Sequence, residues 1–176
     1  MHDSQGYLRI SSLPAVLMVI GLGLIGGCTI DLFGFRSGTY TGSPACVLDV
    51  TDPTGATGQE PFTEDLTVDI DRSDAFTING VPVEIGAMHV RSLPNAELAF
   101  EIVAIRQSAR ELQVTYEPRP TLPGIEMSGQ LIETYRWDKD HITASAAAEL
   151  AVSSTDGVAN FSVTCNGNLL SSASTP

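Results

Sequence analysis

The sequence predicts an all-β fold, arranged as an antiparallel up-and-down meander of about eight or nine strands. Apolar and polar residues alternate with a period of two through much of residues 38–170, which is typical of half-buried strands. Turn-forming residues separate these segments, and an Asn-Gly pair, a strong hairpin signal, stands between two of them. We therefore expect a single β-domain over residues 38–170, long enough to enclose a hydrophobic core.

In the first half of the domain, alternation marks four segments: residues 38–50, 66–71, 76–78 and 81–85. Asn79 and Gly80 separate the last two and predict a two-residue hairpin turn. Pro82 cannot donate a backbone hydrogen bond, so its strand is expected at a sheet edge or at a bulge. The glycines of residues 52–58 are interpreted as part of a turn-rich loop.

In the second half, four further segments alternate: residues 112–117, 131–137, 142–152 and 161–165. A proline-rich loop is expected over residues 118–124. Residues 96–112 also show helical spacing of apolar residues, but their density of β-forming residues favours a hairpin that turns at residues 107–110. The alanine run 146–148 has high helix propensity, yet its place in a strict alternation favours a strand.

The two ends of the domain are expected to lie close together. One side of the first strand carries an apolar set and so does one side of the last strand: Cys46, Leu48 and Val50, and Phe161, Val163 and Cys165. If both sets face inward, the meander closes into a barrel of the lipocalin-like, up-and-down kind, or into a two-sheet β-sandwich.

The charge of the chain limits its partners. The net charge is −12, and residues 1–27 contain one arginine and one aspartate, so their removal leaves that value unchanged. Such an excess of negative charge repels phosphate polyanions, which makes nucleic acid an unfavourable partner. An anionic membrane surface would not attract this domain electrostatically either, so any attachment to a membrane requires an anchor.

The N-terminus supplies a candidate for that anchor. Arg9 precedes an apolar run that starts at Leu13, and Gly26 and Gly27 then lead to Cys28, which is the order of a secretory signal. Residues 25–28, Ile-Gly-Gly-Cys, resemble the lipobox of bacterial lipoproteins. The resemblance implies lipidation of the Cys28 thiol, cleavage after Gly27 and usually acylation of the freed amine.

On this interpretation residues 1–27 are a signal peptide, residues 28–37 are the lipidated cysteine and a short tether, and residues 171–176 are a disordered tail. The protein would then be a lipid-anchored protein of the cell envelope. Thr29 stands where aspartate commonly signals inner-membrane retention in the family, so the resemblance favours the outer membrane. An uncleaved membrane anchor and a soluble secreted protein are the alternatives.

The two remaining cysteines, Cys46 and Cys165, lie near the two ends of the domain. In an oxidising compartment they predict one disulfide, with two separate buried thiols as the alternative. They are 119 positions apart and lack the short spacing of zinc ligands, so no metal site is expected.

Motifs for catalysis are not found. The chain has no G-x-S-x-G, no H-E-x-x-H and no phosphate-binding glycine loop, so no catalytic residue and no cofactor is assigned. His89 and His141 are interpreted as surface or packing residues. Residues 69–74 only partly match a calcium loop, because they lack its glycine and its distal glutamate.

One carboxylate stands on a face that should point inward. Glu133 shares its alternation face with Tyr135 and Trp137, so it requires a partner such as an arginine, a shifted pKa or a ligand. Ala144 and Ala146 belong to the inward row of another strand, where small side chains leave space. We take these five residues as a hypothetical site for a small apolar ligand or for the approach of an envelope partner. A structural or assembly adaptor with a filled core is the alternative, and an envelope hydrolase comes third.

Overall fold

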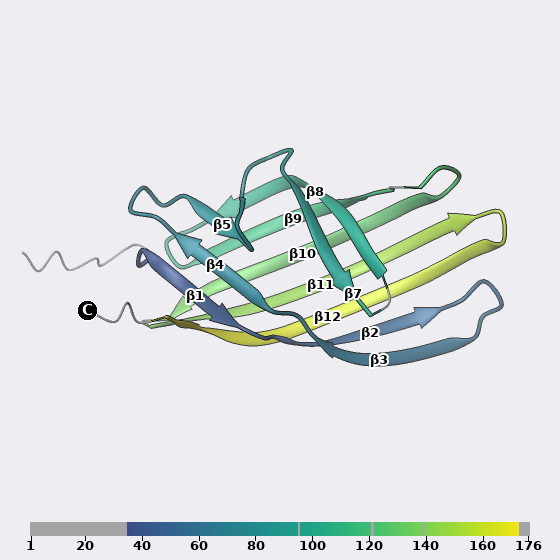
Figure 1. Cartoon of the computed structure of the whole chain (residues 1–176), viewed down its shortest axis with the longest axis horizontal. Coiled ribbons are helices and arrows are strands. Elements are labelled where there is room, and N and C mark those ends of the chain that lie inside the picture. The colour runs from purple at the N-terminus through teal and green to yellow at the C-terminus, as the bar shows by residue number, and fades with distance from the viewer. Residues whose placement is uncertain (1–34, 95, 121, 139, 173–176) are drawn as a thin grey trace, which may run out of the picture. The chain divides into compact units, whose positions relative to one another are not determined.

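A computed structural model describes residues 35–172 except residues 95, 121 and 139. The described residues contain strands and no helix, and the strands form one antiparallel, nearly closed, barrel-shaped sheet (Figure 1). The predicted fold class is therefore confirmed. In chain order the strands are β1 (Gly38–Gly42), β2 (Ala45–Thr51), β3 (Thr57–Thr63), β4 (Leu66–Ile70), β5 (Phe76–Ile78), β6 (Val81–Pro82), β7 (Met88–Leu93), β8 (Ala96–Gln107), β9 (Glu111–Arg119), β10 (Glu126–Asp138), β11 (His141–Ser154) and β12 (Gly157–Ser171).

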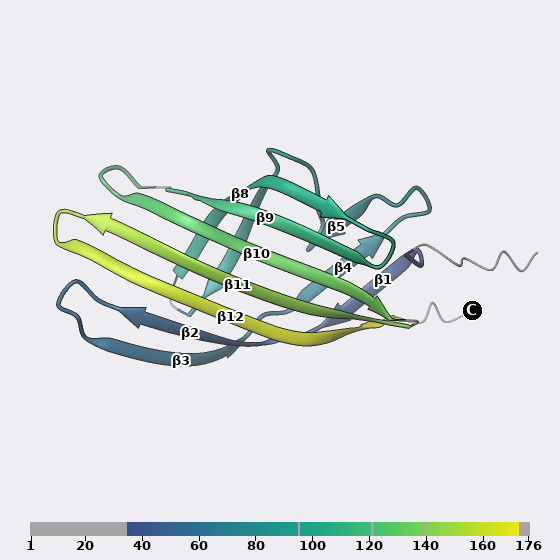
Figure 2. The same cartoon turned by 180° about the vertical axis from the view of Figure 1, so that it is seen from behind.

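The strand order along the sheet is β6-β5-β4-β1-β12-β11-β10-β9-β8-β7, and β2 and β3 continue the sheet beside β12. The last strand, β12, thus pairs with both β1 and β2, as expected for a domain whose ends meet. Seen from behind, β12 to β8 form a continuous series of neighbouring strands (Figure 2). Among the described residues no helix is long and apolar enough to cross a membrane.

Two long strands are each interrupted at the same level, which raises the number of strands above the eight or nine predicted. β1 pairs with β4 and β2 pairs with β3 in one common register, so residues 43–44 lie opposite residues 64–65. The backbone N–H of Glu64 donates to the carbonyl of Pro44 at 3.3 Å across this break. Since proline has no N–H of its own, the regular ladder cannot continue through it. The single strand predicted over residues 38–50 is therefore two strands.

The predicted hairpins are present, with two changes of length. β8 and β9 turn at residues 108–110, so the hairpin interpretation of residues 96–112 is confirmed. Asn79 and Gly80 have φ values of 51° and 77°, as a tight turn between β5 and β6 requires. β6 ends at Pro82, short of the predicted residue 85, and β9 extends to Arg119, into the region predicted as a loop. β3 lies outside every predicted segment, because most of its side chains are exposed and give no alternation.

The alanine run lies in β11, and the predicted disulfide lies beside it. Cys46 and Cys165 are bonded, and they are direct partners in the pairing of β2 with β12. Their bond closes a sequence separation of 119 residues. In the chain-entropy model a loop of this size contributes about 4–5 kcal/mol to the free energy of unfolding. We refer to β2, β12 and β11 as the disulfide wall.

The two ends of the sheet order approach one another through side chains. From β7, the His89 ring nitrogen Nε2 lies 3.4 Å from the carbonyl oxygen of Pro82 in β6. Also from β7, Arg91 Nη1 lies 3.6 Å from Glu64 Oε1, at the break between β3 and β4. We call this line of contacts the seam. It joins the edges of the sheet without a continuous backbone ladder.

Candidate functional site

The pairing of four neighbouring strands brings the predicted inward residues together. Glu133 in β10 pairs with Ala146 in β11, Ala146 pairs with Cys165 in β12, and Cys165 pairs with Cys46 in β2. Because residues paired in this way point to the same side of a sheet, all four line the interior. Tyr135 and Ala144 form the next pair in the same direction.

Glu133 is the centre of a buried polar cluster. Its Oε2 accepts hydrogen bonds from Tyr135 Oη at 2.7 Å, from Tyr116 Oη at 2.8 Å and from Arg91 Nη2 at 2.7 Å. The same nitrogen lies 2.6 Å from Oε1, so the two side chains form an ion pair. Glu133 is 5% exposed and Arg91 is 4% exposed. The expectation that an inward Glu133 needs a partner such as an arginine is met by Arg91.

Arg91 reaches this cluster from β7, at the edge of the sheet. Its guanidinium carbon lies 5.6 Å from the centre of the Tyr116 ring, within the range of a cation–π contact. Burial, the largest single effect, lowers the pKa of Arg91, but the charge of Glu133 together with Tyr135, Tyr116 and Glu64 raises the pKa overall, so the guanidinium stays charged. Its Nε is buried and has no hydrogen-bond partner among the described residues.

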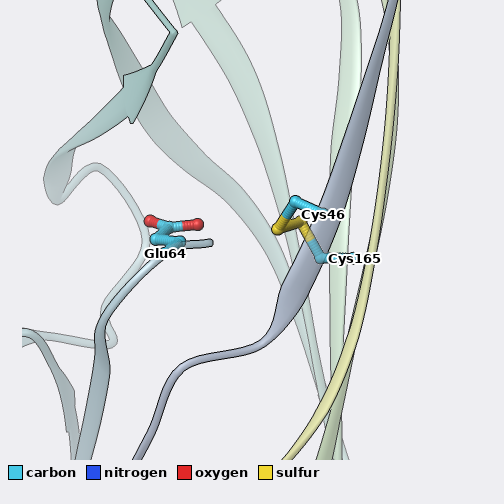
Figure 3. Close-up of side chains that lie close together, drawn as sticks. All are labelled: Cys46, Glu64 and Cys165. Atoms are coloured by element: carbon cyan, nitrogen blue, oxygen red, sulfur yellow. A yellow bond between two sulfur atoms is a disulfide. The ribbon is translucent and has the colours of Figure 1, made fainter. Parts of the chain in front are cut away.

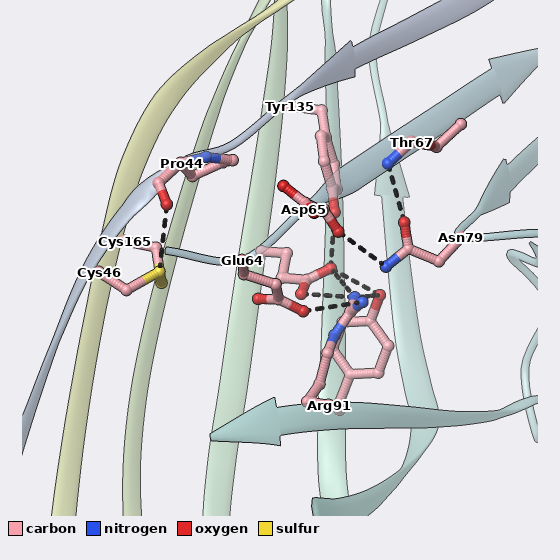
Figure 4. A network of polar contacts seen from close by, with 11 residues as sticks. Pro44, Cys46, Glu64, Asp65, Thr67, Asn79, Arg91, Tyr135 and Cys165 are labelled. Atoms are coloured by element: carbon pink, nitrogen blue, oxygen red, sulfur yellow. Dashed lines mark hydrogen bonds and ion pairs between the residues drawn. A yellow bond between two sulfur atoms is a disulfide. The ribbon is translucent and has the colours of Figure 1, made fainter. Parts of the chain in front are cut away.

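Glu64 is a second carboxylate beside the same guanidinium. Burial raises the pKa of Glu64, while the positive charge of Arg91 opposes that shift and the charge of Glu133 adds to it. Its side chain is 23% exposed, and its only ion pair among the described residues is the 3.6 Å contact with Arg91. Figure 4 shows Glu64, Arg91 and Tyr135 converging on one point of the interior. We call Glu64, Arg91, Tyr116, Glu133 and Tyr135 the interior polar cluster.

The carboxylate of Glu64 also faces the disulfide (Figure 3). Its oxygen and the sulfur atoms of Cys46 and Cys165 all lie within 4.8 Å of one another. The two sulfurs are bonded to each other, whereas a cysteine binds a metal ion through its free thiolate. In the oxidised protein this group is therefore a disulfide with a neighbouring carboxylate, and it does not supply a set of metal ligands.

Two small voids adjoin the interior polar cluster. One of about 30 Å³ is lined by Glu64, Arg91 and Glu133 together with apolar side chains, and one of about 20 Å³ is lined by Glu64, Glu133 and Tyr135 among others. Each can hold a water molecule, whereas a drug-sized ligand needs about 300 Å³ or more. Glu64, Glu133, Ala146 and Cys165 line both voids. We use the name apolar mouth for the other side chains around the larger void, which are buried except for the partly exposed Phe62 and Leu93: Phe62, Leu93, Phe100, Leu131, Ala148, Leu150 and Val163.

The tyrosines and His89 are held in their neutral forms. Burial, and next the charge of Glu133, raise the pKa of Tyr116 and of Tyr135, so both hydroxyls remain hydrogen-bond donors. Burial lowers the pKa of His89, and the charge of Arg91 adds to this. The His89 ring lies 5.5 Å from the Tyr116 ring and is 2% exposed, which makes it a packing residue of the seam.

The other polar groups considered from the sequence are used locally. His141 lies 3.5 Å from Asp140, in the turn between β10 and β11. Asp71 Oδ1 accepts hydrogen bonds from the backbone N–H groups of Ser73 and Ala75, so this carboxylate closes its own turn. The hydrogen bond from the Ser73 hydroxyl, and next those from these two backbone N–H groups, lower the pKa of Asp71. This turn accounts for the acidic residues that partly matched a calcium loop.

Trp137 lies apart from the polar cluster. Its ring contacts Phe35 at 4.0 Å and Phe76 at 5.6 Å between centroids, in an aromatic group at the other end of the interior. Phe35, the last aromatic residue of the predicted tether, thus packs against the domain. Of the five hypothetical ligand residues, Glu133, Tyr135, Ala144 and Ala146 lie together and Trp137 does not join them. Cys28, the predicted site of lipidation, lies outside the described residues.

Sequence reasoning missed Glu64, Arg91 and Tyr116. Glu64 continues the inward alternation of Leu66 and Val68, and this signal could have identified it. Tyr116 was assigned to its strand but was not connected with Glu133. Arg91 gave no such signal, because its strand presents Val90, an apolar residue, to the outside.

Comparison with known proteins gives no assignment for the domain: no protein-family model, no curated protein and no solved structure matches this chain.

Proposed function

We propose that this chain is a lipid-anchored protein of the cell envelope whose β-domain binds a small apolar ligand in the interior of its barrel, without catalysing a reaction. The observation that carries the proposal is the larger void. It is lined by the apolar mouth and by the charged residues Glu64, Arg91 and Glu133. The Nε of Arg91 has no hydrogen-bond partner among the described residues. An apolar pocket with a few convergent polar groups is the usual composition of a small-molecule site.

The dimensions of the site restrict the way in which a ligand can bind. The void of about 30 Å³ accepts only one end of a ligand. The remainder would lie along the apolar mouth, past its partly exposed side chains Phe62 and Leu93. An elongated amphipathic molecule with a small polar end fits this description, whereas a bulky rigid ligand does not.

The cellular location rests on the N-terminal sequence and on the disulfide. The lipobox resemblance at residues 25–28 supports anchoring through Cys28. The disulfide supports an oxidising compartment such as the cell envelope, because disulfides persist there. The outer membrane is favoured by Thr29. Labelling with a radioactive fatty acid tests the anchor: the label should appear on the wild-type chain and be lost in Cys28→Ser, and equal labelling of both would refute it.

Photolabelling of the full chain in nanodiscs of zwitterionic lipid tests the ligand site. The probes are eight-carbon chains that carry a diazirine and end in a hydroxyl, a carboxylate or an ammonium group. We expect at least one of them to label peptides around Phe62 and Leu93, and Leu93→Trp, which fills the mouth, to abolish this labelling. The matched control is Val158→Trp, on an exposed residue of β12. If none of the three probes labels these peptides, the proposal is contradicted.

A second candidate, the adaptor, is supported by one surface. Met88 and Val90 on the outer side of β7 and Ile85 just before it are large apolar residues that are 47–63% exposed. Exposed apolar side chains that cluster are typical of protein-binding surfaces. A photoreactive amino acid at position 90, introduced in the host cell, should give one discrete protein adduct if the adaptor function holds. The same amino acid at position 158 provides the control.

A further inference from the structure

The interior polar cluster restricts the chemistry of the ligand end that it can accept. Arg91 and Glu133 neutralise each other in their ion pair. Glu64 is then a surplus carboxylate, and the described residues offer it only the longer contact with Arg91. Both carboxylates and the guanidinium line the void into which the ligand end would enter.

An anionic ligand end is unfavourable there. A carboxylate in the void would lie beside Glu64 and Glu133, and like charges at short range in a partly buried site repel strongly. A carboxylate also has no hydrogen to donate to Glu64, because an ionised carboxylate only accepts hydrogen bonds.

A cationic ligand end satisfies only half of the site. An ammonium group can donate to Glu64, but it has no lone pair with which to accept from the unpartnered Arg91 Nε, and it is repelled by the guanidinium. A buried donor that is left without an acceptor is costly. A group that accepts from Arg91 and also donates to Glu64 satisfies both residues, and an uncharged hydroxyl or primary amide does this.

Resting on the ligand function proposed above, the geometry points to an amphiphile with a small uncharged donor–acceptor head, such as a long-chain alcohol or a primary amide. The head lies in the void between Arg91 and Glu64, and the chain lies along the apolar mouth. Arg91 and Glu64 are the residues that select the head, and the apolar side chains of the mouth bind the chain without selecting the head.

The three photoprobes measure this selection directly, because they differ only in their head. On the wild-type full chain we expect the alcohol to label the mouth peptides at about tenfold lower concentration than the carboxylate or the ammonium probe, as expected when one buried partner is left unpaired. Unlabelled octanamide should compete with the alcohol, and octanoate should not. Equal labelling by all three probes would refute the head-group selection while the ligand function stands. Preference for either charged probe would also overturn it, and labelling by none would refute the ligand function itself.

Glu64→Gln isolates the surplus charge. The glutamine keeps a polar side chain of the same length and removes the charge, so labelling by the carboxylate probe should rise about tenfold while labelling by the alcohol stays within about twofold. Glu60→Gln is the matched control, because it removes an exposed carboxylate from β3, the strand that ends just before Glu64, and should change neither probe. If Glu64→Gln leaves the carboxylate probe excluded, Glu64 is not the selecting residue. If this variant fails to fold, the ranking of the three probes on the wild type still decides the proposal.

Discussion

Strands β7 and β11 line the same interior with opposite polarity. β11 places Ala144, Ala148 and Leu150 inward and polar residues such as Thr143 outward. β7 places His89 and Arg91 inward and leaves Met88 and Val90 in solvent. Both strands alternate with a period of two, but in β7 the apolar side faces outward, and no strand was predicted over its residues 88–93.

The reason for the difference lies across the interior from β7. Glu133 is buried on β10, and only an inward-pointing Arg91 neutralises it. The small alanines of β11 leave the space that this pair and the two tyrosines occupy. In β7 the inward side is therefore the one that supplies the partner of a buried carboxylate on a distant strand.

The two regions are also held in different ways. The disulfide wall is closed by a covalent bond and continuous pairing, from β2 through β12 to β11. The seam at β7 is closed by the contact of His89 with Pro82 and by the charges of Arg91, Glu64 and Glu133. The following changes act on one region at a time.

Breaking the disulfide should have the largest effect. Reduction, or Cys46→Ala together with Cys165→Ala, removes the constraint on a 119-residue separation and should lower the free energy of unfolding by about 4–5 kcal/mol. Urea unfolding of the oxidised and reduced full chain measures this. A midpoint that does not change on reduction would show that the wall does not depend on its covalent bond.

Removing the charge of Glu133 should have the next largest effect. Glu133→Gln removes the close partner of the buried Arg91 and leaves it only the longer, 3.6 Å contact with Glu64, so it should cost about 3–5 kcal/mol of unfolding free energy. Glu149→Gln, an exposed carboxylate on β11, is the control and should stay within about 0.5 kcal/mol. A loss for Glu133→Gln no larger than for the control would contradict the assignment of the buried pair.

Filling the space beside the cluster should cost less. Ala146 lines both voids, of about 30 and 20 Å³, and Ala146→Leu adds more volume than either holds. Overpacking of this kind costs about 1–3 kcal/mol. Ala147→Leu, on the outward side of the same strand, should be nearly neutral. Equal losses of unfolding free energy at the two positions would contradict the placement of Ala146 on the inward side of β11.

The pH dependence of the unfolding free energy tests whether Glu64 is buried at the seam, and the direction of its pKa shift fixes the sign of the effect. Since burial raises the pKa of Glu64 in the folded state, its protonated form favours folding below the unfolded-state pKa, and this contribution is lost as the pH rises through the folded-state pKa. Glu64→Gln should therefore gain stability relative to the wild type as the pH rises from 4 to 7. His89 titrates in both proteins and cancels in the difference. A constant difference in unfolding free energy across this range would contradict the burial of Glu64.

The parts of the fold that were predicted from sequence share one property: their alternation agrees with their burial. β4, β9, β10, β11 and β12 are of this kind, and the inward facing of Cys46 and Cys165 agrees with the disulfide that was predicted for an oxidising compartment. β3 is mostly exposed, so it offered no pattern. The break at Pro44 depends on its partner across the sheet at residue 64, which local sequence does not identify.

Only part of the candidate site was predicted from the sequence. Glu133, Tyr135, Ala144 and Ala146 come from strands of ordinary polarity, and their register follows from the long β10–β11 hairpin. Arg91 and Glu64 come from the seam, where the position of one edge relative to the other is determined by contacts between distant segments. Trp137 shares the inward side of β10 with Glu133 but lies further along the strand, so sharing a side did not mean sharing a site.

A double-mutant cycle between Arg91 and Glu133 tests most directly whether β7 turns its polar side inward to pair with β10. The unfolding free energies of the wild type, Arg91→Met, Glu133→Gln and the double variant provide the coupling. We expect a coupling of about 2–3 kcal/mol, with the double variant more stable than the sum of the single losses predicts. Additive losses, with a coupling within about 0.5 kcal/mol of zero, would show that the two side chains are not partners and that β7 faces the other way.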